Sequence, residues 1–315
     1  MVTGSYLDNL NSEQQDAVSL TEGAVRVIAG AGTGKTRALV SRYCYLVSTL
    51  GIAPKNILCV TFTNRAANEM KRRVRSMLGD MGLTMRETTI QRTIDEVLEA
   101  KKMQATSYIA EIYELDNEQL KEKYLRAANR NEAIFLRYLY EQKKCFGLDF
   151  NDLINFATYI LEKFPDVREK WQDRMQYVMV DEFQDVSKRQ YTIAQILSGR
   201  HGNLFIVGDP DQTIYSWRGS HVKLFLDFDK VYPAAKTVTL SVNYRSTPEI
   251  LLAANTLIAK NVVRYPKKLS PTKKSGSRPL YNHTKSDQDE AKWIFEEINR
   301  LRDWYSAGRY LEAKC

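Results

Sequence analysis

Eight consecutive residues near the N-terminus have the types and the spacing that bind phosphate groups: Ala29-Gly30-Ala31-Gly32-Thr33-Gly34-Lys35-Thr36. Gly32 and Gly34 allow tight turns and a close backbone approach, and backbone N–H groups point at an anion where a helix begins. Lys35 can reach the β- and γ-phosphates of a nucleotide, and the Thr36 hydroxyl can ligate Mg²⁺. The stretch departs from the strict pattern once, because Ala29 stands where the first glycine is usual.

A pair of acidic residues follows an apolar run further along the chain. Asp181 and Glu182 come directly after Val178-Met179-Val180. Asp181 can hold the Mg²⁺ of a bound nucleotide, often through water. Glu182 can orient and deprotonate an attacking water. Alone the pair would suit a solvated loop equally well, but beside a phosphate loop it predicts hydrolysis of a nucleotide.

Residues 208–219 (GDPDQTIYSWRG) form a third polar loop, which again follows an apolar run. Gln212 can sense a γ-phosphate or its attacking water. Tyr215 and Trp217 are aromatic residues in a polar setting, where they can stack on unpaired bases, worth about 1–3 kcal/mol per base. The alternative for Trp217 is a partly buried packing residue.

Five short apolar runs are predicted to be the strands that position these loops. They are residues 24–29, 57–62, 176–181, 203–207 and 237–241. The runs are continuous rather than alternating and rich in Val and Ile, which is typical of parallel strands covered on both faces. Helical stretches follow most of them, so the fold class is α/β, a parallel sheet with right-handed crossovers.

Residues 82–174 show no strand pattern. Residues 112–125 and 133–144 are rich in strong helix formers, and an insertion of this size predicts a helical subdomain rather than a loop. Residues 262–285 carry seven Lys or Arg, three Pro and no acid, which predicts a basic linker or surface loop. A last helix follows, with an apolar face that little chain is left to cover.

Composition excludes several classes of protein. At roughly 150 residues per domain, 315 residues predict about two domains. Mean hydropathy is −0.43, and no apolar stretch approaches the ~20 residues of a membrane span. Scattered cysteines and histidines argue against a disulfide scaffold or a zinc site, and no secretory signal is visible, so we expect a cytoplasmic protein. The net charge of +8 suits a partner with a phosphate backbone.

Six ordered blocks resemble the motifs of superfamily 1 DNA helicases of the UvrD/PcrA/Rep type. They are LNSEQQ at 10–15 (motif Q), AGAGTGKT at 29–36 (motif I), VTFTNRAANEM at 60–70 (motif Ia), VDEFQD at 180–185 (motif II), GDPDQTIYSWRG at 208–219 (motif III) and NYRST at 243–247 (motif IV). Chance agreement over so much of the chain is negligible. The resemblance implies a RecA-like P-loop NTPase domain that takes ATP and Mg²⁺.

The resemblance also implies individual contacts with the nucleotide. Gln14 is expected to read the adenine edge, and Tyr244 to stack on the adenine ring. Arg245 is expected to reach the γ-phosphate as an arginine finger, which suits a guanidinium. Arg37 flanks the nucleotide or is a solvated helix residue. The expected catalytic residues are Lys35, Glu182, Gln212 and Arg245, and the expected metal ligands are Thr36 and Asp181.

A second set of residues is expected to contact single-stranded DNA. Phe62 and Asn64 come from motif Ia, although Phe62 equally suits the core. Tyr215, Trp217 and Arg218 come from motif III. The resemblance implies ATP-driven movement along single-stranded DNA, 3′ to 5′, with unwinding of duplex at single-strand/double-strand junctions in DNA repair or replication. We expect a monomer without membrane contact.

The resemblance implies a division of the chain into domains. Residues 1–82 and 175–243 are expected to form a RecA-like domain (1A), residues 83–174 a helical insertion subdomain (1B), and residues 244–315 the start of a second RecA-like domain (2A). The threonine-phenylalanine-histidine-serine block of motif Ib and motifs V and VI are missing. We therefore expect the N-terminal part of a longer helicase, whose remaining C-terminal domains are its partners and which unwinds little or nothing alone.

Two alternatives stay open. One is the helicase subunit of a helicase–nuclease complex, which shares these motifs. The other is a non-catalytic nucleic-acid-binding module with a relict nucleotide site. Intact residues at every expected catalytic and metal-binding position argue against the relict, since a decayed site usually loses at least one of them.

Overall fold

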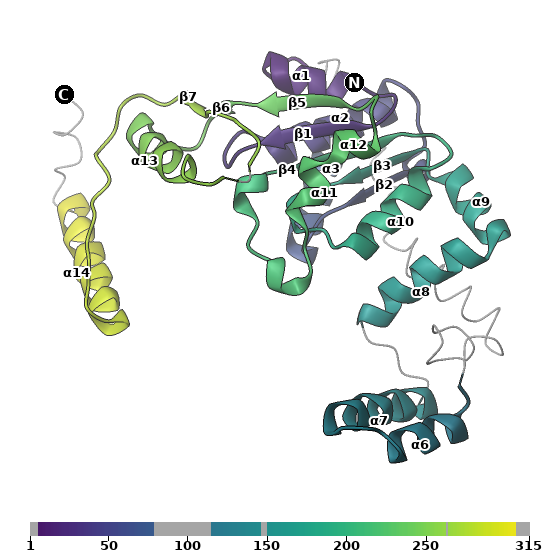
Figure 1. Ribbon diagram of the computed structural model, residues 1–315. Helices are drawn as coiled ribbons and strands as arrows, with labels where there is room; N and C mark the ends of the chain where they lie inside the picture. The colour runs from purple at the N-terminus through teal and green to yellow at the C-terminus, as the bar shows by residue number, and fades with distance from the viewer. Residues whose placement is uncertain (1–5, 79–114, 146–149, 263, 307–315) are drawn as a thin grey trace.

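A five-stranded parallel sheet forms the core of the part of the chain that the computed structural model describes, residues 6–78, 115–145, 150–262 and 264–306 (Figure 1). The strand order is β2-β3-β4-β1-β5. The strands are β1 (Val25–Ala29), β2 (Ile57–Val60), β3 (Tyr177–Val180), β4 (Leu204–Gly208) and β5 (Lys236–Leu240). All five predicted strands are confirmed, with ends within two residues of the prediction. The predicted α/β class is confirmed as well.

Helices cover both faces of this sheet. On one face lie α2 (Lys35–Ser48) and α3 (Asn64–Leu78), and on the other lie α10 (Lys188–Ser198), α11 (Val222–Leu226) and α12 (Phe228–Val231). In β1, Val25, Val27 and Ala29 join the core under α2, whereas Ile28 joins the core under α10. Burial on both sides explains why the strand sequences are continuously apolar.

A short N-terminal helix, α1 (Ser12–Ser19), is tied to the sheet domain by a buried arginine. Arg42 of α2 is 1% exposed and donates hydrogen bonds to the carbonyls at the end of α1, those of Ala17, Val18, Leu20 and Thr21. Its guanidinium also lies 4.5 Å from the Phe205 ring centroid. Burial lowers the pKa of Arg42 to about 10. Arg42 thus fixes the helix that carries Gln14.

The described part of the insertion between α3 and β3 is mainly helical. It contains α6 (Asn117–Leu125), α7 (Arg130–Cys145), α8 (Phe150–Lys163) and α9 (Pro165–Arg174). Helices α8 and α9 pack beside α10, and α6 pairs with α7 further from the sheet (Figure 1). The predicted helices are confirmed over residues 117–125 and 133–144. The position expected for motif Ib lies in residues 79–114, outside the described residues.

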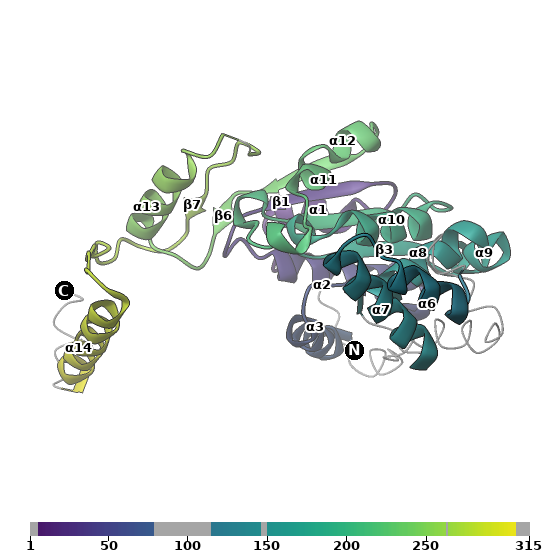
Figure 2. The ribbon, with the colours of Figure 1, turned by 60° about the horizontal axis from the view of Figure 1, so that its bottom comes forward.

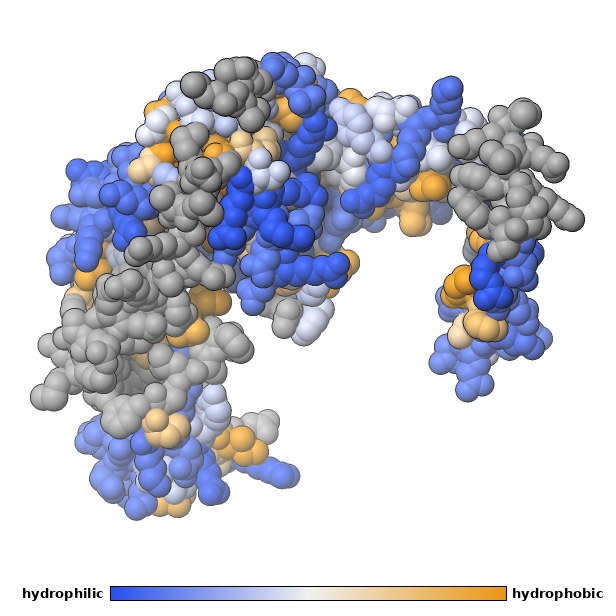
Figure 3. All heavy atoms as spheres, turned by 180° about the vertical axis from the view of Figure 1, so that it is seen from behind, coloured by the Kyte–Doolittle hydropathy of each residue, from blue (hydrophilic) through white to orange (hydrophobic). Residues whose placement is uncertain are grey.

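Beyond β5 the chain leaves the sheet and comes back to it. It forms β6 (Val242–Asn243) and α13 (Pro248–Ile258), and residues 264–272, which we call the return segment, pair with β6 through β7 (Ser270–Pro271). The long helix α14 (Asp287–Ser306) then extends as a separate arm (Figures 2 and 3). As predicted, α14 has an exposed apolar face, which includes Ile294, Phe295 and Ile298.

The described residues also contain four 3-10 turns: η1 (Pro54–Asn56), η4 (Phe183–Asp185), η5 (Pro210–Gln212) and η6 (Ser216–Arg218). Of these, η4 directly follows β3, and η5 and η6 lie in the loop that follows β4. All three therefore fall within the polar motifs of the sequence. In the described ranges, no helix combines the length and the apolarity of a membrane span.

Candidate functional site

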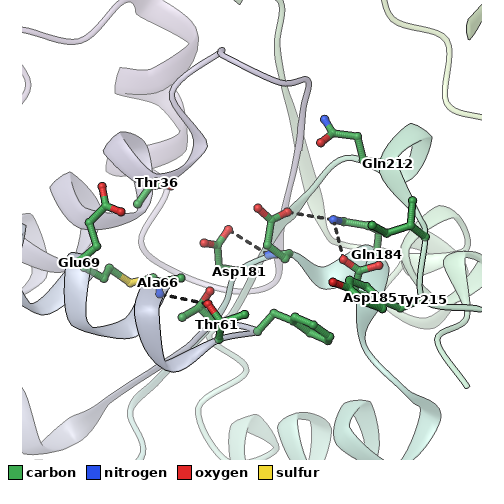
Figure 4. Close-up of a pocket in the computed structure, with 14 residues that line it drawn as sticks. Thr36, Thr61, Ala66, Glu69, Asp181, Gln184, Asp185, Gln212 and Tyr215 are labelled. Atoms are coloured by element: carbon green, nitrogen blue, oxygen red, sulfur yellow. Dashed lines mark hydrogen bonds between the residues drawn. The ribbon is translucent and has the colours of Figure 1, made fainter. Parts of the chain in front are cut away.

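The motif loops meet at one edge of the sheet. The phosphate loop follows β1, motif Ia follows β2, motif II follows β3 and motif III follows β4. Because these strands are parallel, their carboxyl ends share one edge, where α/β sheets bind ligands. A cavity of about 300 Å³ opens there, lined by Thr36, Phe62, Asp181, Glu182, Gln212 and Tyr215 among others (Figure 4).

The phosphate loop has the backbone that its glycines predict. Gly32 and Gly34 have φ of +72° and +88°, the left-handed region, and Gly34 immediately precedes α2. A Cβ at position 32 would also lie 2.6 Å from Arg245 Cβ. Ala29 is the last residue of β1 and is fully buried. Its methyl group belongs to the core, which explains why the loop does without a first glycine.

Lys35 and Glu182 form the centre of the site. Lys35 Nζ lies 2.9 Å from Glu182 Oε2, and their side chains are 10% and 35% exposed. The amide of Gln184 donates to the same Glu182 oxygen at 2.9 Å. Glu182 has φ of +49°, the one positive φ of a non-glycine residue in the described chain. Such backbone strain costs about 1–3 kcal/mol and is concentrated at functional sites.

Asp181 is a buried carboxylate beside this pair. Its residue is 5% exposed, and it accepts a hydrogen bond from the Glu182 backbone N–H at 3.0 Å. Burial raises the pKa of Asp181 to about 6, the negative charge of Glu182 adds to the rise, and Lys35 opposes it. A cation at this point would relieve the cost of the buried charge.

The residues present fit Mg²⁺ held partly by a nucleotide. Asp181 and the Thr36 hydroxyl, both oxygen donors, line the same cavity. No group of three acidic, histidine or cysteine side chains in the described residues could hold a metal by itself. Mg²⁺ characteristically binds through one or two protein oxygens plus phosphates and water, which matches this donor set.

Gln184, which sequence reasoning did not single out, connects motif II to motif III. Its Oε1 accepts a hydrogen bond from the Asp209 backbone N–H at 2.9 Å, and its Nε2 donates to Glu182. A Cβ at position 208 would lie 2.4 Å from Gln184 Oε1, so Gly208 permits this approach. The sequence signal that could have identified Gln184 is its place inside the VDEFQD block.

Gln14 packs against the backbone of the phosphate loop. It is 1% exposed, and its Nε2 donates to the Thr33 carbonyl at 2.8 Å. Its Oε1 accepts from the Asn11 backbone N–H, while the Asn11 side chain accepts from the Gln14 backbone N–H, a capping box at the start of α1. The structure therefore places Gln14 at the loop, and its reading of adenine stays a prediction.

Motif IV lies directly on the phosphate loop. The Asn243 side chain donates to the Ala31 carbonyl at 2.6 Å, and the Tyr244 backbone N–H donates to the Gly32 carbonyl at 2.9 Å. Tyr244 is 41% exposed, and Arg245 is exposed beside Gly32. Both residues thus lie near the loop, and their contacts with a nucleotide stay predictions. Arg37 is exposed near the start of α2.

Three aromatic side chains form a row, and two of them, Phe62 and Tyr215, line the cavity. The Phe62 and Tyr215 rings are stacked, with centroids 4.6 Å apart, and Tyr215 and Trp217 are 6.4 Å apart. Trp217 is 76% exposed and Phe62 37% exposed, so Trp217 is no packing residue. Asn64, the first residue of α3, is exposed nearby. The side chain of Arg218 lies outside what the structure describes.

The prediction that residues 262–285 form only a linker or surface loop is wrong at two positions. The side chains of Arg264 and Lys267 are 14% and 4% exposed, and both pair with motif III aspartates. The buried charges of Arg264 and Lys267 are tolerated because the motif III aspartates, distant in sequence, compensate them. Composition alone cannot show such pairing.

Together, the parallel sheet, the phosphate loop at the start of α2 and the buried carboxylate that follows β3 define the fold class of the P-loop nucleoside triphosphatases. Comparison with known proteins narrows this class. The UvrD/REP helicase N-terminal domain matches residues 10–97 and 83–233, and the UvrD-like helicase C-terminal domain matches residues 238–311. The chain belongs to the UvrD/REP helicase family.

Named relatives agree with this assignment. The chain is 35% identical to the ATP-dependent DNA helicase PcrA of Staphylococcus aureus, over 93% of this chain and 46% of that protein. It is 36% identical to the ATP-dependent DNA helicase PcrA of Staphylococcus epidermidis, over 98% of this chain and 48% of that protein. The chain thus spans about half the length of the curated relatives that it matches.

Proposed function

We propose that this chain contributes the nucleotide site of a helicase that binds ATP with Mg²⁺ and hydrolyses it to drive movement along single-stranded DNA, 3′ to 5′, and unwinding of duplex in DNA repair or replication, and that the chain unwinds little or nothing alone. The names of the relatives support an ATP-dependent DNA helicase. The observation that carries the proposal is the shared cavity. It is lined by Thr36, Asp181 and Glu182, which are proposed to serve the nucleotide, and by Phe62 and Tyr215, which are proposed to contact DNA.

On the nucleotide side, the charges of the site support a set of proposed roles. Lys35 would bind the β- and γ-phosphates, and Thr36 and Asp181 would hold Mg²⁺, whose positive charge would offset that of the phosphates. Glu182 Oε2, held by Lys35 and Gln184, takes a proton from the attacking water. Gln212 senses the γ-phosphate or that water. Other proposed contacts come from residues 29–36, Gln14, Arg37, Tyr244 and Arg245.

On the DNA side, an aromatic row provides stacking surfaces. Phe62, Tyr215 and Trp217 are partly or largely exposed and adjacent to one another. Bases of any sequence can stack on such rings, which suits an enzyme that moves along a strand. Asn64 and Arg218 are proposed to contact the same strand.

We also infer the domain organisation from this architecture. Residues 1–82 and 175–243 form domain 1A, residues 83–174 form subdomain 1B, and residues 244–315 begin domain 2A. The match of residues 238–311 to the UvrD-like helicase C-terminal domain supports a change of domain near β6. The protein acts at single-strand/double-strand junctions as a monomer in the cytoplasm.

The test compares ATP hydrolysis with and without a single-stranded oligonucleotide in the chain, in Glu182→Gln and in Glu169→Gln. Glu169 is an exposed residue of α9 and serves as the matched control. We expect DNA to stimulate hydrolysis, and Glu182→Gln to reduce turnover by about 10²–10⁴-fold, while Glu169→Gln behaves as the parent. DNA binding without any binding or hydrolysis of ATP would support the relict module instead.

A further inference from the structure

Four charged side chains form a buried ionic cluster between motif III and the return segment. Lys267 Nζ lies 2.6 Å from Asp209 Oδ1 and 2.6 Å from Asp211 Oδ2. Arg264 pairs with Asp211 Oδ2 at 3.1 Å. The side chains of Asp209 and Lys267 are each 4% exposed, and that of Asp211 is 7% exposed. Among the described residues, Lys267 is the cation that pairs with Asp209.

Asp209 in turn holds Gln212. Asp209 Oδ2 accepts a hydrogen bond from Gln212 Nε2, and Oδ1 accepts from both Lys267 and the Asp211 backbone N–H. A carboxylate can only accept hydrogen bonds, so it determines which end of the Gln212 amide faces it. The Oε1 end of Gln212 is directed away from Asp209, and the side chain lines the cavity. Asp209 therefore sets the orientation of the residue proposed to meet the γ-phosphate or its water.

The return segment that carries Lys267 also touches the phosphate loop and motif IV. A Cβ at Gly30 would lie 2.6 Å from Leu269 Cδ1, so the Leu269 side chain rests against the loop. The Ser270 and Thr272 backbone N–H groups donate to the carbonyls of Ser241 and Asn243. The backbone that carries Lys267 is thus held next to motifs I and IV.

Stability is a poor explanation for this cluster. Removing charges from water costs free energy that their attraction only partly returns, and a well-packed apolar replacement is often equally stable. What a buried charge pair does provide is one defined geometry, because loss of either partner leaves an uncompensated charge. The cluster thus fixes the distance between the return segment and motif III.

We propose that Lys267 is a positioning residue of the nucleotide site, which holds Gln212 in its orientation through Asp209. Movement of the return segment away from motif III would withdraw Lys267 and release Gln212. The position of the segment that follows motif IV is thereby linked to the readiness of the site for hydrolysis. The inference rests on the proposed function, because Gln212 acts only where a nucleotide is hydrolysed.

The experiment measures backbone hydrogen exchange over residues 208–217, together with the kinetics of ATP hydrolysis. The variants are Lys267→Met, which keeps the length and loses the charge, and Lys267→Arg, which keeps the charge. Lys268→Met is the matched control, because Lys268 is the exposed neighbour. We expect Lys267→Met to accelerate exchange in this peptide by about tenfold and to lower kcat by up to about 100-fold with little change in KM. Lys267→Arg should recover most of both.

Equal exchange over residues 208–217 in Lys267→Met and Lys268→Met would overturn the proposal, whether or not the chain hydrolyses ATP. A parent chain without hydrolysis would instead refute the proposed function. If Lys267→Met also accelerates exchange throughout the sheet, the comparison moves to Lys267→Gln, which still donates a hydrogen bond. In Lys267→Gln, accelerated exchange confined to residues 208–217 supports the proposal, whereas exchange over residues 208–217 equal to that of Lys268→Met overturns it.

Discussion

Lys35 Nζ and Glu182 Oε2 lie 2.9 Å apart, so the cation of the phosphate loop and the proposed catalytic base neutralise each other. A triphosphate would compete with Glu182 for Lys35 and would meet Glu182 as a like charge. The two members of one ion pair therefore have opposite effects on nucleotide binding.

We expect Glu182→Gln to bind a non-hydrolysable ATP analogue about two- to fivefold more tightly than the parent chain, because a competing charge is removed. Lys35→Met should weaken binding by about 10- to 100-fold, since charge-assisted hydrogen bonds to phosphate are lost. Isothermal titration calorimetry measures both. Weaker binding by Glu182→Gln would contradict the competition, and Lys55→Met, which alters an exposed lysine, is the control for net charge.

Trp217 should contribute strongly to DNA binding. We expect Trp217→Ala to raise the Kd for a single-stranded oligonucleotide by about 5- to 100-fold, because one base loses its stacking partner. Fluorescence anisotropy of a labelled oligonucleotide measures this change. Tyr281→Ala removes an aromatic side chain that is 89% exposed outside the row, and it should leave the Kd unchanged. An equal rise in Kd in both variants would contradict a specific role of the aromatic row in DNA binding.

The buried carboxylate of Asp181 predicts a pH dependence of stability in EDTA. The pKa of Asp181 is raised to about 6 by burial, so the folded state binds a proton more tightly than the unfolded state. Above that pKa the buried charge lowers the free energy of unfolding, by at most about 3 kcal/mol, and protonation relieves this cost as the pH falls through 6.

Asp181→Asn should therefore melt at a higher temperature than the parent chain at pH 8, and the difference should shrink as the pH falls from about 6 toward 4. Thermal unfolding followed by circular dichroism at several pH values measures it. A difference in Tm that stays constant from pH 8 to pH 4 would show that Asp181 does not titrate in this range.

Arg42 should be essential to the attachment of α1. We expect Arg42→Met to lower the free energy of unfolding by about 2–4 kcal/mol, because buried carbonyls lose their donor. Arg42→Lys should recover only part of this free energy, because an ammonium group lacks the planar fork of donors of a guanidinium and cannot lie flat against the Phe205 ring. Urea denaturation measures the loss. Arg200→Met, which breaks an exposed pair with Asp173, should change stability by less than about 1 kcal/mol.

Much of the fold and of the site could be predicted from sequence because the signals are local. Continuous apolar runs mark strands buried on both faces, and parallel strands bring their carboxyl ends together. The phosphate loop, Asp181, Glu182 and Gln212 therefore had to meet once the strands were recognised. Trp217 could also be predicted from local sequence, because an aromatic side chain in a polar loop has no apolar core to pack against.

The ionic cluster could not be predicted in this way. Lys267 lies 58 and 56 residues beyond Asp209 and Asp211, and a lysine among prolines and other lysines resembles a solvated side chain. Its burial depends on partners that only the folded chain brings near. The contact between Gln14 and the Thr33 carbonyl is of the same kind, because 19 residues and a strand separate the two.

The return segment also bears on how the chain can be divided. A fragment ending at residue 243 would contain every strand of the five-stranded sheet, and by sequence alone it would resemble a complete domain. It would nevertheless lack Arg264, Lys267 and Leu269, leaving two buried aspartates without counter-ions and Gly30 without its cover. A fragment that keeps the ionic cluster and the backbone hydrogen bonds to β6 extends through Thr272, so the chemical boundary of the nucleotide site lies beyond the last strand of the sheet that supports it.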